Sequence, residues 1–90
     1  MELEWDENKR QLTLENRGLD FAHADKIFSG YVFTIRDDRF EYGEDRYQTL
    51  GKLGRKLIMV VWTPRGDRRR IISMREADAK EKRNYNHRLE

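Results

Sequence analysis

Five arginines lie between residues 65 and 75, and they are the side chains in this sequence best suited to chemistry. They are Arg65, Arg68, Arg69, Arg70 and Arg75. A guanidinium presents a planar fork of donors that matches phosphate oxygens, and it stays protonated at any working pH. Adjacent arginines on a short hairpin also repel one another. The cluster therefore predicts a phosphate-binding surface; the alternative is an edge strand that its charges protect from aggregation.

The strand that carries these arginines must also point them the same way. In a regular strand Arg70 and Arg75 lie on opposite faces, because side chains alternate. The two can meet at one phosphate only through a bulge, or if Arg75 already lies in the corner before the next helix. The sequence leaves both arrangements open.

Tyr85 lies near these arginines in the predicted fold. It shares one helical face with Ala77, Glu81 and Arg88, because these four residues recur at helical spacing. A tyrosine beside arginines can stack on a base or donate a proton, and it can equally anchor the core with its hydroxyl in water. Both interpretations stand at this point.

A loop rich in carboxylates lies around Gly43. Its acidic residues are Asp37, Asp38, Glu41, Glu44 and Asp45. Oxygen ligands suit hard cations, but the spacing does not match a calcium loop, so a solvated loop is predicted and no metal site. The two histidines, His23 and His87, stand in different predicted helices without ligand spacing and are expected at the surface.

The elements that must hold these residues follow from the hydrophobic pattern. We expect an α+β domain in the order β-α-α-β-β-β-β-α, with a small antiparallel meander, two N-terminal helices and a C-terminal helix. The predicted strands cover residues 3–5, 31–35, 46–53, 57–62 and 68–75, and the helices cover 7–16, 21–28 and the residues from 76 onward. Leu57–Trp62 has apolar residues of both parities, which predicts the central strand.

Composition narrows the classes of protein. The chain has 90 residues, of which 40% are charged and none is cysteine, so it contains no disulfide framework and no thiolate metal site. Its longest apolar run has six residues, Leu57 to Trp62, and its acidic start lacks the layout of a signal peptide. We expect a cytoplasmic protein without a membrane segment. Residues 1–50 carry a net charge of −5 and residues 51–90 one of +7, which indicates a polyanion or an acidic partner for the second half.

The sequence resembles the BrnT toxins of bacterial and archaeal type II toxin–antitoxin systems. The matching segments run nearly from end to end, and the most specific are the Trp5-Asp6-Glu7 opening with Lys9 and the Arg70-Ile71-Ile72-Ser73-x-Arg75 strand. Further matches are Gly18-Leu19-Asp20-Phe21 with Ala24 and Phe28, Tyr42-Gly43-Glu44-Asp45-Arg46 with Gly51, and Ala77, Glu81 and Tyr85. On this basis, residues 1–90 form a single BrnT-like toxin domain.

This resemblance implies a RelE-like fold and a metal-independent ribonuclease that blocks translation without a cofactor. It also implies a BrnA-type antitoxin, a ribbon-helix-helix protein that neutralises the toxin in a hetero-oligomer. In that complex only the antitoxin contacts operator DNA. The family usually has an Asn three residues before a Lys-His-Gly segment, where this chain has Thr13 and Asn16-Arg17-Gly18. Arg17 cannot replace a histidine as a base, because a guanidinium stays protonated at any working pH.

Roles for individual residues follow from the motifs and the resemblance together. We predict Arg70 and Arg75 on the reacting phosphate, Glu44 as general base, and Tyr85 as stacking group or acid. Further contacts to RNA are predicted from Lys9, Arg46, Arg68 and Arg69. The alternative is a catalytically impaired RelE-like module that acts only by binding nucleic acid or its antitoxin, and the missing histidine favours it.

Overall fold

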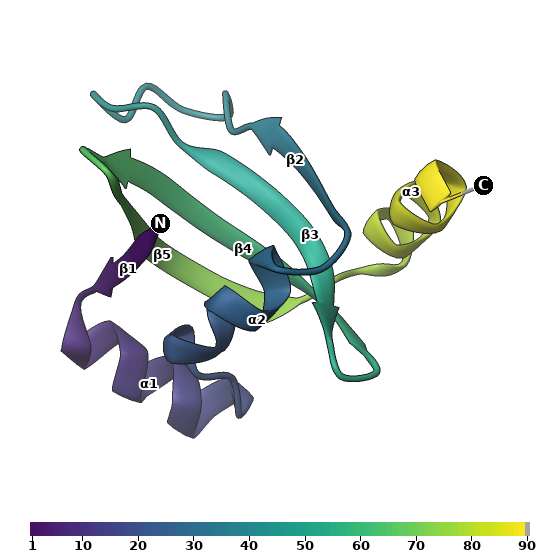
Figure 1. Ribbon diagram of the computed structural model, residues 1–90, viewed down its shortest axis with the longest axis horizontal. Coiled ribbons are helices and arrows are strands. Elements are labelled where there is room, and N and C mark those ends of the chain that lie inside the picture. The colour runs from purple at the N-terminus through teal and green to yellow at the C-terminus, as the bar shows by residue number, and fades with distance from the viewer. Residues whose placement is uncertain (90) are drawn as a thin grey trace.

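A computed structural model describes residues 1–89 and has the predicted order of elements (Figure 1). The strands are β1 (Glu2–Trp5), β2 (Val32–Arg36), β3 (Tyr47–Leu53), β4 (Lys56–Arg65) and β5 (Arg68–Glu76). The helices are α1 (Glu7–Arg17), the 3-10 turn η1 (Phe21–His23), α2 (Ala24–Phe28) and α3 (Ala79–Leu89). None of the helices within these residues is long and apolar enough to cross a membrane.

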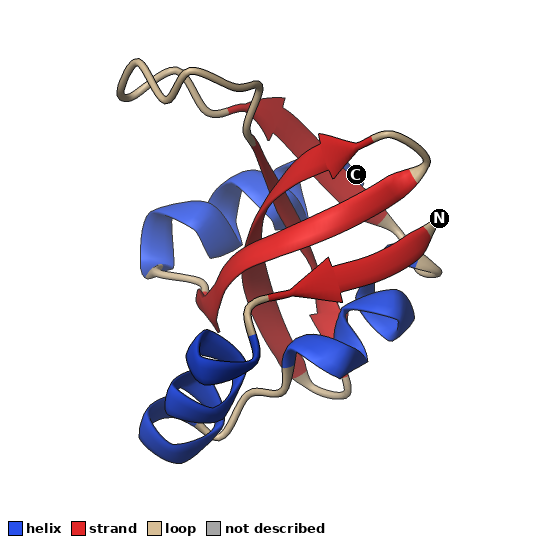
Figure 2. Ribbon diagram, turned by 90° about the vertical axis from the view of Figure 1, so that its left-hand side faces the viewer, coloured by secondary structure: helices blue, strands red, loops and turns tan. Residues whose placement is uncertain are grey.

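The strands form one sheet in the order β1-β5-β4-β3-β2. The strands β2 to β5 pair antiparallel as the predicted meander, and β4 lies at the centre of the sheet as expected. The short β1 pairs parallel with β5, but only along residues 68–71 of that strand. The second half of β5 is therefore not covered by β1, and α1 runs beside it instead (Figures 1 and 2).

Each face of the sheet carries its own small core. On the α2 face, η1 and α2 pack on side chains of the central strands, and the buried residues are Leu19, Phe21, Ala24, Ile27, Ile58, Val60, Trp62, Ile71 and Met74. On the α3 face, the last helix packs on a second group: Leu50, Leu57, Met59 and Val61, with Ala77 and Tyr85. Figure 2 shows α2 and α3 on opposite sides of the sheet. Burial on both sides explains why β4 reads as a continuous apolar run.

One extra residue interrupts the pairing of β4 with β5. Val61 pairs with Ser73 whereas its neighbour Trp62 pairs with Ile71, so Ile72 has no partner of its own and forms a β-bulge. Ile71 and Met74 are three positions apart, yet both are buried on the α2 face. Only a shift of one residue lets both side chains reach the same face.

The ends of the helices follow ordinary capping chemistry. Asp6 caps α1 by accepting a hydrogen bond from the Lys9 amide, and Gly18 ends this helix in the left-handed conformation with φ 67°. The last helix starts at Ala79 rather than at the predicted residue 76. The reason is a reciprocal capping box in which Asp78 and Glu81 each accept from the other's amide, while β5 continues to Glu76.

Gly51 provides a test of how tightly α2 packs on the sheet. A methyl group at this position would lie 2.7 Å from the Ile27 side chain and 3.0 Å from that of Val32. We expect Gly51→Ala to lower the free energy of unfolding by about 1–3 kcal/mol, because buried neighbours must move. Urea denaturation measures the difference.

Gly30→Ala is the matched control, because its added methyl group would meet only ordinary contact, 3.7 Å from the Ile27 carbonyl oxygen. Equal stability of the two variants would contradict the tight packing at Gly51.

Candidate functional site

The bulge brings the two motif arginines of β5 onto the same face of the sheet. Arg70 pairs with Thr63 before the bulge, and Arg75 pairs with Met59 after it. Met59 belongs to the core of the α3 face, and the one-residue shift places Arg70, Ser73 and Arg75 on that face together. This is one of the two arrangements that the sequence left open.

Both arginines are held by carboxylates from other elements. Arg70 donates to Glu4 of β1 at 2.8 Å, and Arg75 makes two hydrogen bonds of 2.8 Å to Glu81 of α3. The hydrogen bonds from Arg75 are the main cause that lowers the pKa of Glu81, and the same bonds raise that of Arg75. The guanidinium groups are thus fixed in direction but already occupied.

Glu44 contributes a further charged group at the β4–β5 hairpin end. Its carboxylate accepts from Arg46 at 3.3 Å and from Arg65 at 3.2 Å. Thr63, which pairs with Arg70, donates its hydroxyl to the carbonyl of Asp45. The loop that carries Glu44 is therefore anchored at Thr63, the residue of β4 that pairs with Arg70.

Three further carboxylates of this loop are occupied by arginines. Asp37 is buried and accepts from Arg39, whereas Asp38 and Asp45 both pair with Arg36. Hydrogen bonds from Arg39 are the main cause that lowers the pKa of Asp37.

A cleft of about 380 Å³ lies between α1 and the uncovered half of β5. Its lining residues are Lys9, Leu12, Thr13, Asn16, Arg17, Ile72 and Ser73. The α1 residues recur every three or four positions and so share one helical face. Arg17 donates to the Met74 carbonyl at 2.8 Å, which ties the end of the helix to β5. Ser73 lines this cleft and also lies on the face of the sheet that carries Arg70 and Arg75.

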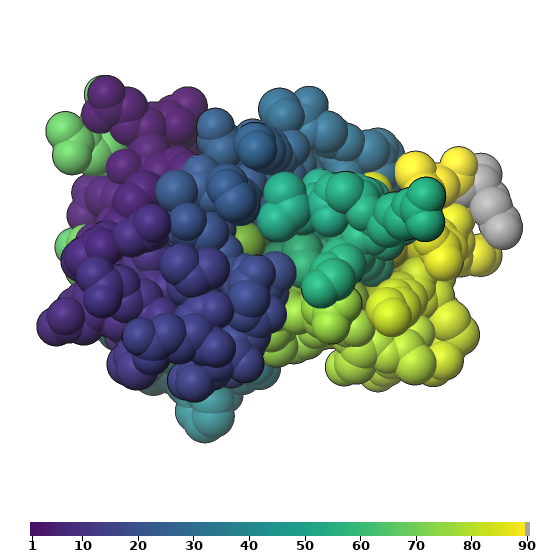
Figure 3. Space-filling model, turned by 90° about the horizontal axis from the view of Figure 1, so that it is seen from below, coloured from purple at the N-terminus to yellow at the C-terminus, as the bar shows by residue number. Residues whose placement is uncertain are grey.

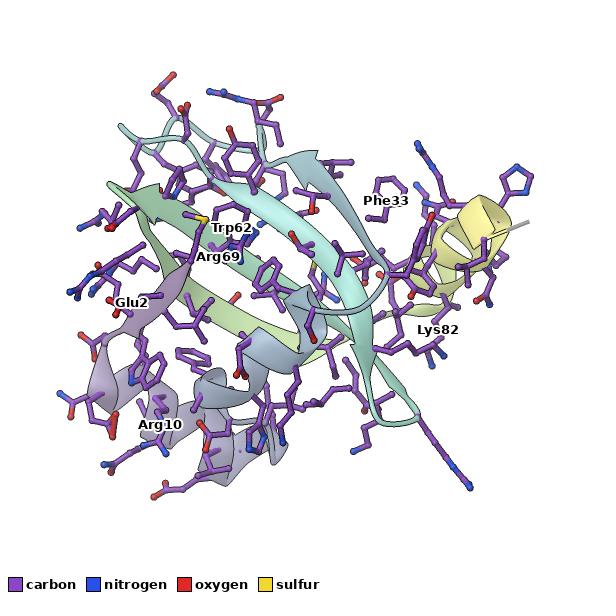
Figure 4. The ribbon with its side chains drawn as sticks, viewed as in Figure 1. Glu2, Arg10, Phe33, Trp62, Arg69 and Lys82 are labelled. Atoms are coloured by element: carbon purple, nitrogen blue, oxygen red, sulfur yellow. The ribbon has the colours of Figure 1, made fainter. Side chains whose placement is uncertain are left out.

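Arg69 lies apart from the other β5 arginines. It pairs with Pro64 on the α2 face, and its guanidinium stacks 3.7 Å from the ring centre of Phe28 and 4.5 Å from that of Trp62 (Figure 4). Burial lowers its pKa, and its buried Nε has no hydrogen-bond partner among residues 1–89. Arg69 covers aromatic core side chains and does not join Arg70 and Arg75.

Tyr85 is buried, with 2% of its surface exposed. Its hydroxyl donates to the Tyr31 carbonyl at 3.0 Å, and its ring packs edge-on against the Tyr31 ring. Of the two interpretations offered by the sequence, the structure matches the core anchor, with the hydroxyl bonded to backbone instead of water. The predicted surface histidines, His23 and His87, are both exposed.

One protein family matches most of this chain. The family described as "Ribonuclease toxin, BrnT, of type II toxin-antitoxin system" matches residues 5–81. The chain belongs to the BrnT family. The matched span includes Lys9, Glu44, both motif arginines and the whole cleft, but it ends before Tyr85. No curated protein matches the chain.

The α1–β5 cleft is lined by the three positions at which the resemblance implies Asn, Lys and His. Thr13, Asn16 and Arg17 stand there beside Lys9 and Ser73. Sequence reasoning noted the substitutions but missed the cleft, and it gave Ser73 no role. The spacing of Lys9, Thr13, Asn16 and Arg17 along one helical face was the available signal, although nothing local showed that β5 lies opposite.

We expect the Tyr85 hydroxyl to contribute to the stability of this BrnT domain. Tyr85→Phe removes one hydrogen bond and should lower the free energy of unfolding by about 1 kcal/mol, whereas Tyr85→Ala should lower it by about 3–5 kcal/mol. Chemical denaturation compares the two variants. Full stability of Tyr85→Phe together with lost ribonuclease activity would restore a catalytic role for the hydroxyl.

The Arg75–Glu81 pair predicts a pH dependence of stability. The pKa of Glu81 is lowered in the folded protein, so the pair stabilises at neutral pH and its contribution is lost as the pH falls through that lowered pKa. Glu81→Gln keeps an oxygen for the capping bond to Asp78 but removes the charge. We expect it to cost about 1 kcal/mol at pH 7, since both groups are partly exposed.

Urea denaturation of wild type and Glu81→Gln between pH 7 and strongly acidic pH measures this dependence. The difference between them should shrink toward zero on acidification. A difference that stays constant over the whole range would show that the charge of Glu81 contributes nothing.

Proposed function

We propose that this BrnT-family chain is a metal-independent endoribonuclease that inhibits translation by cleaving RNA on the α3 face of its sheet. The observation that carries the proposal is the β-bulge at Ile72, which aligns Arg70, Ser73 and Arg75 beside a cleft lined by Lys9 and Arg17. Cations of a strand and a helix thus lie on neighbouring parts of the surface, and phosphate groups are the ligands that such a surface suits.

The reaction that we propose uses the 2′-hydroxyl of the RNA. Its oxygen attacks the adjacent phosphorus, the bond from phosphorus to the 5′ oxygen breaks, and the products are a 2′,3′-cyclic phosphate and a free 5′-hydroxyl. Glu44 takes the proton of the 2′-hydroxyl, and solvent protonates the leaving 5′ oxygen. Arg70 and Arg75 stabilise the charge that develops on the phosphorane-like transition state.

The ion pairs of these arginines fit that role. A phosphate can compete with Glu4 for Arg70 and with Glu81 for Arg75, because each guanidinium keeps its fork of donors in a fixed direction. Arg46 and Arg68 extend the contacts toward the hairpin end, where Arg68 lies 3.5 Å from Glu2 and is exposed. Competition with carboxylates makes ground-state binding modest, whereas charge developing in the transition state favours the phosphate.

We further propose that a BrnA-type antitoxin, a ribbon-helix-helix protein, neutralises this chain in a hetero-oligomer and alone contacts operator DNA. The family description supports an antitoxin partner in general. The exposure of Leu12 favours the cleft as part of the surface that this partner covers. This apolar side chain is 56% exposed beside Lys9 and Arg17.

A second candidate function is a catalytically impaired module that binds RNA or antitoxin without cleavage. Two observations favour it. Arg17 contacts the Met74 carbonyl at the position where the family usually has histidine, and the hydroxyl of Tyr85 is used in the core. Neither group supplies the proton transfers that cleavage requires.

Cleavage of total RNA in EDTA, with analysis of the ends, separates the two candidates. We expect wild type to leave cyclic phosphates, Arg75→Ala to cleave at least about 10²-fold more slowly, and Glu44→Gln to lose about 10²–10⁴-fold. Lys26→Ala, on α2 at the opposite face, is the control that removes a positive charge elsewhere.

RNA binding by wild type without cleavage at any enzyme concentration would reject the nuclease and support the binding module. Full activity of Glu44→Gln would remove Glu44 from the mechanism.

A further inference from the structure

A second cationic cleft lies at the end of the sheet that is remote from the β4–β5 hairpin. It has a volume of about 240 Å³ and lies between the β3–β4 turn and α3 (Figure 3). Its lining residues are Lys52, Arg55, Lys56, Leu57, Glu76, Lys82 and Asn86. Figure 4 shows Lys82 reaching from α3 toward the turn. Four cations therefore face one hollow that contains a single carboxylate.

The charges in this second cleft are not neutralised, unlike those of most arginines of the β4–β5 hairpin. Arg65, Arg68, Arg70 and Arg75 each pair with a glutamate. Within residues 1–89, none of Lys52, Arg55, Lys56 and Lys82 takes part in an ion pair. Part of the surplus positive charge of the second half of the chain therefore lies in this cleft without a carboxylate partner.

The backbone under these cations is well fixed. Lys52 and Lys56 lie on paired strands on either side of a tight turn, in which Gly54 has a φ of 62°. The Ala77 amide donates to the Leu57 carbonyl at 2.9 Å and joins the approach to α3 to β4. A ligand of this cleft therefore meets lysines whose backbone positions are already set.

The second cleft and the proposed reaction site both border the start of α3. Arg75 is bonded to Glu81 in the first turn of this helix, and the next residue, Lys82, lines the second cleft. An RNA strand that binds at Arg75 therefore needs to pass only the first turn of α3 to meet Lys82.

We propose that the second cleft binds the phosphodiester backbone of the RNA beyond the cleaved bond. This proposal rests on the proposed function of the Arg70–Arg75 site. Its only apolar lining side chain, Leu57, is buried, and the core of a protein interface is normally apolar or aromatic and poor in lysine. Lysines around a polar hollow instead suit phosphates, whose bound counterions they release. The lysines hold the strand without reading its sequence.

The experiment measures binding of a short single-stranded RNA whose riboses are 2′-O-methylated and therefore cannot be cleaved. Fluorescence anisotropy over a series of salt concentrations compares wild type with Lys52→Ala, Lys56→Ala, Lys82→Ala and the triple variant. Each lost phosphate contact should reduce the slope of log affinity against log salt by about 0.7, so the triple variant should lose about 2. Lys26→Ala should keep the wild-type slope.

Different outcomes separate this proposal from the proposed nuclease. Equal slopes for wild type and the triple variant would overturn it while leaving cleavage at Arg75 intact. A slope that is reduced in the triple variant, together with wild type that never cleaves unmodified RNA, would support the second cleft and reject the nuclease. If the triple variant kept its RNA slope but lost binding to poly-glutamate, the cleft would belong to an acidic protein partner, which would overturn the proposal.

Discussion

The pairing of β4 with β5 around the extra residue Ile72 is the constraint on which the rest of the molecule depends. Ile71 and Met74 are 1% and 0% exposed and belong to the same core. A regular strand could bury only one of them there, and exposing the other would forfeit about 1.5–3 kcal/mol. In a domain whose cores are this small, that loss is large. The bulge is thus fixed by core packing, and the alignment of Arg70 with Arg75 follows from it.

The opposite charges of the two halves of the chain have a structural meaning that composition alone could not reveal. Glutamates from the acidic first half pair with arginines of the basic second half, as in Glu4 with Arg70 and Glu44 with Arg65. These pairs hold β1 and the β2–β3 loop against the hairpin, and with the Arg75–Glu81 pair they neutralise every arginine of the cluster except Arg69. A group of unpaired cations lies instead on the β3–β4 turn and the start of α3.

Local signals in the sequence were sufficient for the order of the elements and the central strand. Contacts between distant segments were not predictable in the same way. Arg69 is stacked because Phe28, forty-one positions away, packs beside Trp62, and Tyr85 is buried because Tyr31 lies against it. The bulge was only one of two arrangements that could bring Arg70 and Arg75 together. The alternation of side chains along a strand cannot decide between them before the core is known.

The α1 wall of the first cleft differs from the rest of the fold in how it is held. None of the residues of α1 is buried, and its side chains fasten it mainly through polar contacts, from Arg10 to Asp20 and from Arg17 to Met74. A segment that buries little apolar surface opens at a lower free energy than the core strands. The β5 side of the cleft belongs to the paired sheet, whereas the α1 wall is the part that a bound partner can stabilise. Because Leu12 is exposed on that wall, any partner that covers it adds the apolar contact that α1 lacks in the free protein.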